Sequence, residues 1–356
     1  MGINRFFATI ASGAPRALES LANADGIKER RVGVDAPVFL YRARAAQPFG
    51  WAYLTYVAEH LIWLRSLECP AVFVFDGAAV AAEKQAERAK RAETKAKNEE
   101  RKALWSARLQ ETLDWDEVLS CRAKVEQYLR ATVNVGESER LHLKRLVVAL
   151  GFSWQEAPGE AERHLAALQI MGYIEEVVTE DSDALVCGAR SIVRNFWALR
   201  SGSSESSAQR VWRDAILEGL AVDATTLRTA AVLAGCDFAP KLRSVGLARA
   251  LKAAQLHPGD IRACLGVLKK SEEAECAHTV RAFERAMGLL TAEPSAPLPA
   301  EDVATLRPVD REALAQLVES LEEAGEPWAL RAVLSRRSPP ALRELLPSAW
   351  THSAHC

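Results

Sequence analysis

Short apolar runs alternate with longer helical patterns over the first two thirds of the chain. The runs that read as strands occupy residues 31–34, 71–75, 152–154 and 177–178. A helix is predicted over about 50–67, where apolar residues recur at spacings of three and four. Strands that alternate with helices in this way are typical of a mostly parallel sheet covered by helices. The pattern therefore predicts an α/β fold with a mostly parallel central sheet.

Residues 81–110 differ in composition from the segments before them. They hold nine Lys or Arg and five Glu, with almost no large apolar residue. Such a segment has helical propensity but no stripe that would face a core, so it predicts a solvated helix that projects from the body. Apolar character returns at Trp105, Leu109, Leu113 and Trp115, and residues 125–133 are predicted to form the return limb.

Residues 214–290 are predicted to be helical, and a Pro/Ala-rich linker separates them from a last helical segment. We therefore expect a core over residues 1–255, followed by a helical extension over 256–292, the linker at 293–300 and a helical C-terminal segment over 301–356. Within the core, the predicted parts are 1–80, about 81–135, and 136–255.

Composition narrows the class of protein. The 356 residues are 49% hydrophobic and 26% charged, with a formal net charge of −2, and no apolar run approaches the ~20 residues that a membrane helix needs. The seven cysteines form no C-x-x-C pair, which favours a reduced protein without a zinc site. No secretory signal is recognised at the start. We expect an intracellular protein, nuclear or cytoplasmic, that is neither secreted nor bound to a membrane.

Seven carboxylates lie in five places, most of which are the predicted ends of strands. They are Asp35, Asp76, Glu160, Glu162, Asp181, Asp183 and Asp237. Taken singly, each has an ordinary explanation as a turn residue or a helix cap. Together they indicate a site, because open α/β sheets bind ligands beyond the carboxyl ends of their strands. So many anions share one cleft only if hard cations neutralise them, which predicts Mg²⁺-like ions and a phosphorylated substrate.

Six segments of the chain, in the same order, resemble the motifs of the flap-endonuclease family, the XPG-like structure-specific 5′-nucleases. They are Gly2-Ile3, Val34-Asp35-Ala36, Val74-Phe75-Asp76-Gly77, Ala157-Pro158-Gly159-Glu160-Ala161-Glu162, Thr179-Glu180-Asp181-Ser182-Asp183-Ala184-Leu185 and Leu233-Ala234-Gly235-Cys236-Asp237-Phe238. The resemblance covers roughly residues 1–255. It implies a PIN-like nuclease core with a helical arch at 81–135 and a helix–turn–helix for duplex DNA at 233–252.

The resemblance also implies roles for individual residues. The seven carboxylates would hold two Mg²⁺ ions, with Mn²⁺ able to substitute, and Gly2 would lie near the active site. Lys84 and Arg91, two helical turns apart on the arch, would clamp the scissile phosphate, and Lys90 would contact DNA. The alternative for this segment is an ordinary solvated helix with Glu/Lys pairs.

Further DNA contacts are implied outside the arch. Tyr41 matches the position of an aromatic that stacks on an unpaired base, although a core tyrosine explains it equally well. In the helix–turn–helix, the implied contacts are Lys241, Arg243, Ser244, Gly246 and Arg249. Ser244 stands where the family has the first glycine of G-x-G, which leaves potassium binding at this turn open.

The function implied by the resemblance is hydrolysis of DNA phosphodiester bonds near single-strand/double-strand junctions or 5′ ends, in replication, repair or recombination. Flap endonuclease, 5′–3′ exonuclease and junction resolvase are not separated by the sequence. Two alternatives stay open: a PIN-like nuclease that acts on RNA, and a DNA-binding scaffold with a vestigial site. No sliding-clamp peptide is recognised, and a monomer is expected.

Overall fold

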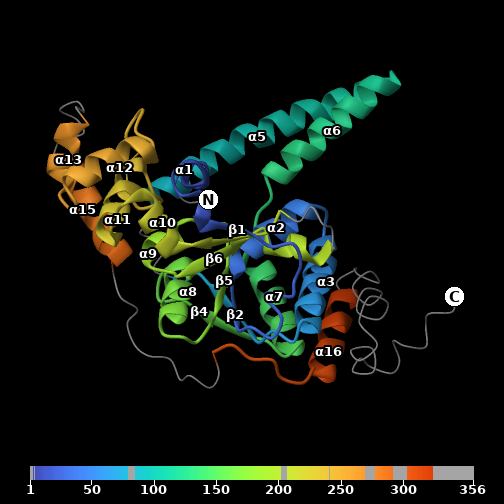
Figure 1. The fold of residues 1–356 in the computed structure, drawn as a ribbon. Helices are drawn as coiled ribbons and strands as arrows, with labels where there is room; N and C mark the ends of the chain where they lie inside the picture. Colours follow the sequence, from blue (N-terminus) through green and yellow to red (C-terminus); the bar gives the residue numbers. More distant parts are fainter. Residues whose placement is uncertain are drawn as a thin grey trace. The chain divides into compact units, whose positions relative to one another are not determined.

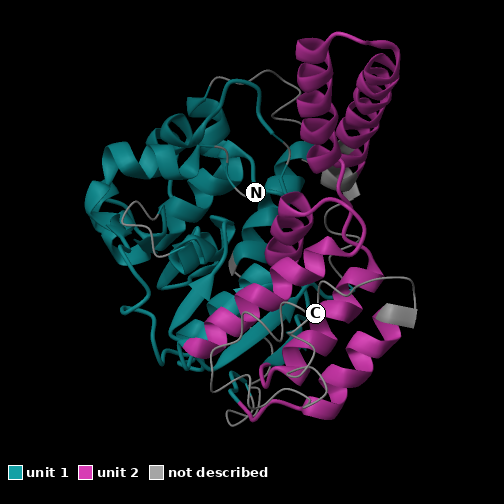
Figure 2. Ribbon diagram, turned by 90° about the vertical axis from the view of Figure 1, so that its right-hand side faces the viewer, with its two compact units in different colours: residues 1–36, 67–83, 153–306 teal, residues 37–66, 84–152, 307–356 magenta. Residues whose placement is uncertain are grey.

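The computed structural model describes residues 3, 5–78, 85–201, 207–239, 241–268, 277–291 and 303–323. The chain divides into two compact units, coloured separately in Figure 2. Unit 1 comprises residues 1–36, 67–83 and 153–306, and unit 2 comprises residues 37–66, 84–152 and 307–356. The whole of the predicted linker at 293–300 and most of the C-terminal segment lie outside the described residues. The domain boundaries predicted from the sequence stay predictions.

Unit 1 contains one seven-stranded sheet in the order β1-β7-β6-β5-β2-β3-β4 (Figure 1). The strands are β1 Leu18–Ser20, β2 Val32–Asp35, β3 Ala71–Phe75, β4 Ser153–Glu156, β5 Glu176–Val178, β6 Ser191–Arg194 and β7 Gln209–Trp212. Strands β4, β3, β2, β5 and β6 are parallel, whereas β7 is antiparallel to β6 and to β1. The predicted mostly parallel sheet is confirmed.

The central strands are buried along their whole length, as expected for parallel strands covered by helices. Helix α8 (Ala161–Ile170) packs against β2, β3 and β5. Its close approach depends on Gly33 in β2, where a Cβ atom would come within 2.4 Å of Ile174 Cδ1 and 2.6 Å of Leu165 Cδ2. The glycine therefore sets how near the helix lies to the strand that ends in Asp35.

The remaining helices of unit 1 are mostly C-terminal to the sheet, in the region that was predicted to be helical. They are α1 Phe6–Gly13, η1 Pro15–Ala17, α9 Asp183–Cys187, η2 Phe196–Ser201, α10 Arg213–Leu220, α11 Ala224–Ala234, α12 Leu247–Leu256, α13 Ile261–Val267 and α15 Ala277–Thr291. Helix α11 packs against α12 and α15, and their apolar faces continue the core of unit 1. This helical group carries the segment that was predicted to contact duplex DNA.

Unit 2 is helical in its described part. Its helices are α2 Ala36–Ala46, whose first residue belongs to unit 1, α3 Ala52–Ser66, α5 Gln85–Glu111, α6 Trp115–Ala131, α7 Glu137–Ala149 and α16 Arg311–Glu323. Helices α5 and α6 pack against each other as a long hairpin (Figure 1). No side chain described between residues 91 and 111 is buried, so the predicted solvated helix is confirmed.

The return limb begins ten residues earlier than the sequence predicted. Helix α6 starts at Trp115, not near 125, because Asp114 caps it by accepting a hydrogen bond from the backbone N–H of Glu117 at 2.9 Å. Asp116 and Glu117 in the first turn also complement the helix dipole. The apolar periodicity on which the prediction relied is weak here, whereas the cap is a local signal.

A buried aromatic group holds α3 to α7 within unit 2. The hydroxyl of Tyr53 lies 3.0 Å from Nδ1 of His142, and the ring of Trp51 lies 4.7 Å from the His142 ring. The guanidinium of Arg44, from α2, lies 5.1 Å from the centre of the Tyr53 ring. Burial, assisted by Arg145, lowers the pKa of His142, which favours a neutral imidazole in this group.

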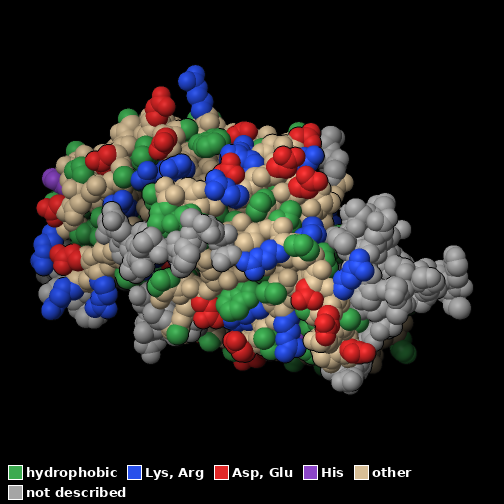
Figure 3. Space-filling model, turned by 90° about the horizontal axis from the view of Figure 1, so that it is seen from below, with side chains coloured by type: hydrophobic (Ala, Val, Ile, Leu, Met, Phe, Trp, Pro, Cys, Tyr) green, Lys and Arg blue, Asp and Glu red, His purple; other side chains and the backbone are tan. Residues whose placement is uncertain are grey.

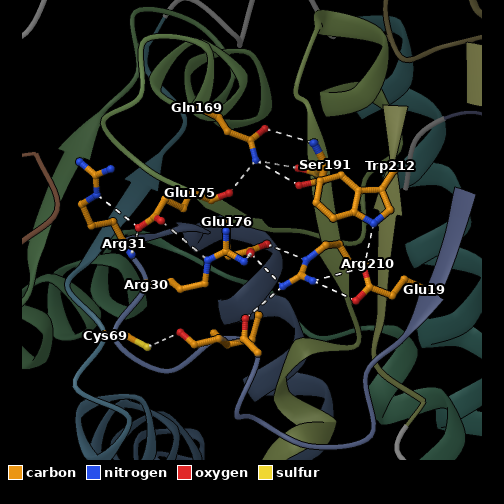
Figure 4. Close-up of polar contacts among 12 residues, drawn as sticks. Glu19, Arg30, Arg31, Cys69, Gln169, Glu175, Glu176, Ser191, Arg210 and Trp212 are labelled. Carbon is orange, nitrogen blue, oxygen red and sulfur yellow. Dashed lines mark hydrogen bonds and ion pairs between the residues drawn. The ribbon is translucent and has the colours of Figure 1, made fainter. Parts of the chain in front are cut away.

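An ion-pair network joins strands β1, β5 and β7 of unit 1 (Figure 4). Arg210 of β7 donates two hydrogen bonds to Glu176 of β5, at 3.2 and 2.9 Å, and a pair to Glu19 of β1. Arg30 also contacts Glu176 at 2.6 Å. Arg210 and Glu176 are both buried, so each depends on the other for compensation of its charge.

On the face drawn in Figure 3, acidic and basic side chains of the described residues are interspersed. This mixture agrees with the formal net charge of −2. Among the described residues, none of the helices has the length and apolar character needed to span a membrane.

Candidate active site

Parallel pairing brings the strand-end carboxylates to one edge of the sheet. Asp35 is the last residue of β2 and pairs with Val74 of β3, so Asp76 follows just beyond it. On the other side, Val34 pairs with Val178 of β5, so Asp181 and Asp183 follow beyond the same edge. The grouping predicted from the sequence is therefore produced by the register of three adjacent strands in unit 1.

Asp76 is joined directly to the helix that carries two further carboxylates. Its Oδ1 accepts a hydrogen bond from the backbone N–H of Ala161 at 3.0 Å, in the first turn of α8. Glu160 is the N-cap residue of α8, and Glu162 lies in its first turn. Asp76, Glu160 and Glu162 thus converge on the N-terminus of one helix, where the helix dipole favours negative charge.

Gly77 makes this approach possible. Its N–H donates to the carbonyl of Gly159 at 2.9 Å. A Cβ atom at Gly77 would come within 2.0 Å of the backbone carbonyl oxygen of Ala157, which has no room to move aside. The glycine after Asp76 is therefore needed for the end of β3 to lie against the loop before α8.

Asp35, Asp181 and Asp183 form a second group that is linked by hydrogen bonds. The hydroxyl of Thr179 donates to Asp35 Oδ2 at 2.7 Å and accepts from the Asp181 N–H at 3.0 Å. Asp181 Oδ1 in turn accepts from the Asp183 N–H at 2.9 Å. Thr179, which the sequence analysis did not single out, thus orients the carboxylate of Asp35 and holds the backbone at Asp181.

The thiols of Cys187 and Cys236 are affected by the charges of the candidate ligands. Burial, followed by the charges of Asp183 and Glu162, raises the pKa of the Cys187 thiol well above its usual value. Burial and the charges of Asp183 and Asp237 raise the pKa of Cys236 to about 12. Both thiols therefore experience the negative charge of Asp183.

The donor set suits hard divalent cations. Asp35, Glu160, Glu162, Asp181 and Asp183 are each between 1% and 7% exposed, and all offer carboxylate oxygen. Such a concentration of buried acid is costly without neutralising cations. Within the described residues, no three Asp, Glu, His or Cys side chains already enclose an ion. Asp35, Asp76 and Asp181 accept hydrogen bonds from protein groups.

The N-terminus reaches the second acidic group. The backbone N–H of Ile3 donates to the hydroxyl of Ser182 at 3.0 Å, between Asp181 and Asp183 in sequence. Gly2 itself and Lys84 lie outside the described residues, as does the side chain of Lys90. Arg91 is exposed on α5, and Tyr41, on α2, is 43% exposed, so the core-tyrosine alternative for Tyr41 is wrong.

The turn between α11 and α12 adopts an unusual backbone conformation. Ser244 has a φ of 62°, in the region that glycine favours, within a turn closed by a 3.2 Å hydrogen bond from the N–H of Val245 to the carbonyl of Leu242. Gly246 is the N-cap residue of α12. The serine that replaces the first glycine of the motif thus keeps the glycine-like conformation.

The basic residues of this turn are not equivalent. Lys241 and Arg243 are exposed. Arg249, also exposed, directs its guanidinium to two carbonyls: Nη2 lies 3.1 Å from Leu268 O and Nη1 lies 3.5 Å from Ser244 O. Lys241 and Arg243 thus lie between α11 and α12, whereas Arg249 lies in the first turn of α12.

Comparison with known proteins places this site in a family. The XPG I-region family model matches residues 151–237, which include five of the seven carboxylates. The chain is 31% identical over 263 residues to flap endonuclease 1 of Drosophila grimshawi, covering 71% of this chain and 63% of that protein. It is 30% identical over 270 residues to flap endonuclease 1 of Aedes aegypti, covering 72% of this chain and 67% of that protein.

Solved structures share the fold. The catalytic core of Rad2 in complex with a DNA substrate matches with a TM-score of 0.61 at 17% identity, covering 94% of this chain and 99% of that one. The Holliday junction-resolving enzyme GEN1, in complex with product DNA and Mg²⁺, matches with a TM-score of 0.56 at 18% identity, covering 94% of this chain and 78% of that one. The chain spans slightly less than two thirds of the length of the Drosophila grimshawi flap endonuclease 1. On these matches, the chain belongs to the XPG-like flap-endonuclease family.

Proposed function

We propose that the protein is a structure-specific 5′ nuclease that hydrolyses DNA phosphodiester bonds near single-strand/double-strand junctions. The observation that carries this proposal is the convergence of two linked carboxylate groups at the carboxyl edge of the sheet, in a chain of this family. Flap cleavage and 5′–3′ exonuclease action are both compatible with it. The role would lie in DNA replication, repair or recombination, inside the cell.

The proposed ligands of two Mg²⁺ ions are the seven carboxylates, with Mn²⁺ as a substitute. Bound divalent ions supply the polarisation of an attacking water and stabilise the departing oxygen. Around them, Thr179 holds Asp35 and Asp181 in place, and the Ala161 N–H holds Asp76. We do not include a potassium ion at the turn, because Ser244 replaces the glycine that the resemblance requires.

The proposed DNA contacts come from both units. In unit 2, Lys84, Lys90 and Arg91 of the arch would meet the phosphates of the cleaved strand, with Arg91 exposed as such a role requires. Tyr41 would stack on an unpaired base, a contact worth about 1–3 kcal/mol. In unit 1, Gly2 would place its amine beside the cluster, next to the residue that bonds Ser182. Lys241 and Arg243 would contact duplex phosphates.

A substrate panel tests the proposal. The pure protein is incubated with a 5′-labelled flap duplex, the single strand and the blunt duplex, with Mg²⁺ or with EDTA. Metal-dependent cutting at the flap junction is the expected result. A flap substrate of the same sequence made of RNA tests the alternative of an RNA nuclease, which predicts that the RNA flap is cut in preference to the DNA flap. Intact DNA in every lane, with a mobility shift still visible, would favour a DNA-binding scaffold instead.

A further inference from the structure

The turn between α11 and α12 is held in shape from within the protein. A residue other than glycine in the left-handed region costs about 1 kcal/mol or more, because its Cβ approaches backbone atoms. Ser244, with a φ of 62°, lies in this region, so its conformation is destabilising by itself. Something in the surrounding structure must therefore favour the turn, and the contacts of Arg249 identify a candidate.

Arg249 joins the turn to a neighbouring helix. Its Nη2 donates to the carbonyl of Leu268 at 3.1 Å, and Leu268 is the C-cap residue of α13. Its Nη1 lies 3.5 Å from the carbonyl of Ser244 itself. A guanidinium is well placed at a helix C-terminus, because that end has unsatisfied carbonyls and a partial negative charge. The side chain thus fixes the strained residue to a rigid support.

The same segment connects the turn to the acidic cluster. Gly235 ends α11 with a φ of 94°, and a Cβ atom there would meet Lys241 Cγ at 2.7 Å. The packing of Lys241 on Gly235 brings the chain back towards Asp237. The contact of Lys241 with Gly235 therefore links the turn to the segment that carries Asp237.

We propose that Arg249 is a positioning residue, which holds the 242–246 turn in its phosphate-binding shape and is not itself a phosphate contact. The inference rests on the proposed function, since it requires that this turn binds duplex DNA. It separates Arg249 from Arg243, an exposed arginine six residues earlier, which serves as the matched control.

Salt dependence distinguishes the two roles. Each phosphate contact that is lost lowers the slope of log K against log[salt] by about 0.9, whereas a lost positioning contact lowers affinity without changing the number of phosphates neutralised. Duplex binding is measured in EDTA, so that no cleavage occurs, for the full chain and for Arg243→Ala and Arg249→Ala. We expect Arg249→Ala to bind about tenfold more weakly with the slope of the parent chain, and Arg243→Ala to flatten the slope.

A rescue completes the test. Glycine adopts a positive φ without strain, so Ser244→Gly should restore most of the affinity that Arg249→Ala loses. A slope that flattens in Arg249→Ala as it does in Arg243→Ala overturns the inference, and so does the absence of rescue by Ser244→Gly. A parent chain that binds no duplex at all would instead overturn the proposed function together with the inference.

Discussion

Asp76 and Ala161, 85 residues apart in sequence, are joined by a 3.0 Å hydrogen bond from the Ala161 N–H to the Asp76 carboxylate. The bond fixes the end of β3 to the start of α8. It therefore places one candidate metal ligand beside two others, Glu160 and Glu162, before any cation is present. The Asp76 carboxylate thus accepts a hydrogen bond at the start of α8 and is also a proposed metal ligand. Substitutions of Asp76 distinguish these two roles.

Asp76→Asn should abolish cleavage while preserving the fold. The amide keeps an oxygen for the Ala161 N–H but loses the negative charge. Asp76→Ala should lose cleavage and also about 1 kcal/mol of stability, because the cap disappears. Thermal unfolding and flap cleavage, measured on both variants, check this. Equal unfolding temperatures for the two would show that the hydrogen bond contributes nothing.

Gly77→Ala should be strongly destabilising. The new methyl group would lie 2.0 Å from a backbone oxygen, so β3 and the loop before α8 must separate. The expected loss of about 2–3 kcal/mol is that of an overpacked site, and activity should fall with it. Gly266→Ala is the matched control, since nothing lies within 4 Å of a Cβ atom there. Chemical denaturation of both variants gives the comparison, and similar stabilities would contradict the close approach.

Arg210→Met should cost about 3 kcal/mol, because it leaves the buried carboxylate of Glu176 with Arg30 as its remaining ion-pair partner. The double variant Arg210→Met, Glu176→Leu should recover most of the loss, since neither charge remains buried. Urea unfolding measures both. If the single variant is as stable as the parent, the network does not hold β7 to β5.

Stability should fall as the pH drops below the unfolded-state pKa of histidine, near 6.5. Burial lowers the pKa of His142 in the folded protein, so the unfolded chain binds the proton more readily. The stabilisation is present above pH 6.5 and is lost as the pH falls towards the folded pKa. His164, whose pKa burial also lowers, acts in the same direction.

His142→Gln should therefore make the acid limb of the stability profile shallower. Unfolding midpoints between pH 5 and 7.5 provide the measurement. An identical acid limb in parent and His142→Gln chains would show that this imidazole is not the group responsible.

The sequence predicted those parts that are encoded locally. The apolar runs predicted as strands at 31–34, 71–75 and 177–178 coincide with most of β2, β3 and β5, and the basic composition of α5 matches its solvated state. Pro37 is a local signal for helix α2, since proline is favoured in a first helical turn. The apolar periodicity of this helix is weak.

The parts that escaped prediction depend on contacts between distant residues. The buried pair of Arg210 and Glu176 is indistinguishable in sequence from surface charge, because only the sheet order brings the two together. In the same way, the link from Thr179 to Asp35 spans 144 residues. The positive φ of Ser244 was also not predicted, because a serine in the sequence does not indicate a left-handed backbone conformation as a glycine does.

The most direct test of the account is flap cleavage by the parent chain and by Asp181→Ala, with DNA binding followed in the same samples. We predict that the parent cuts the flap duplex at the junction with Mg²⁺ and not with EDTA. Asp181→Ala should bind the same DNA with unchanged affinity in EDTA and leave it intact with Mg²⁺. Cleavage that persists in pure Asp181→Ala protein would contradict the assignment of the carboxylate cluster as the active site.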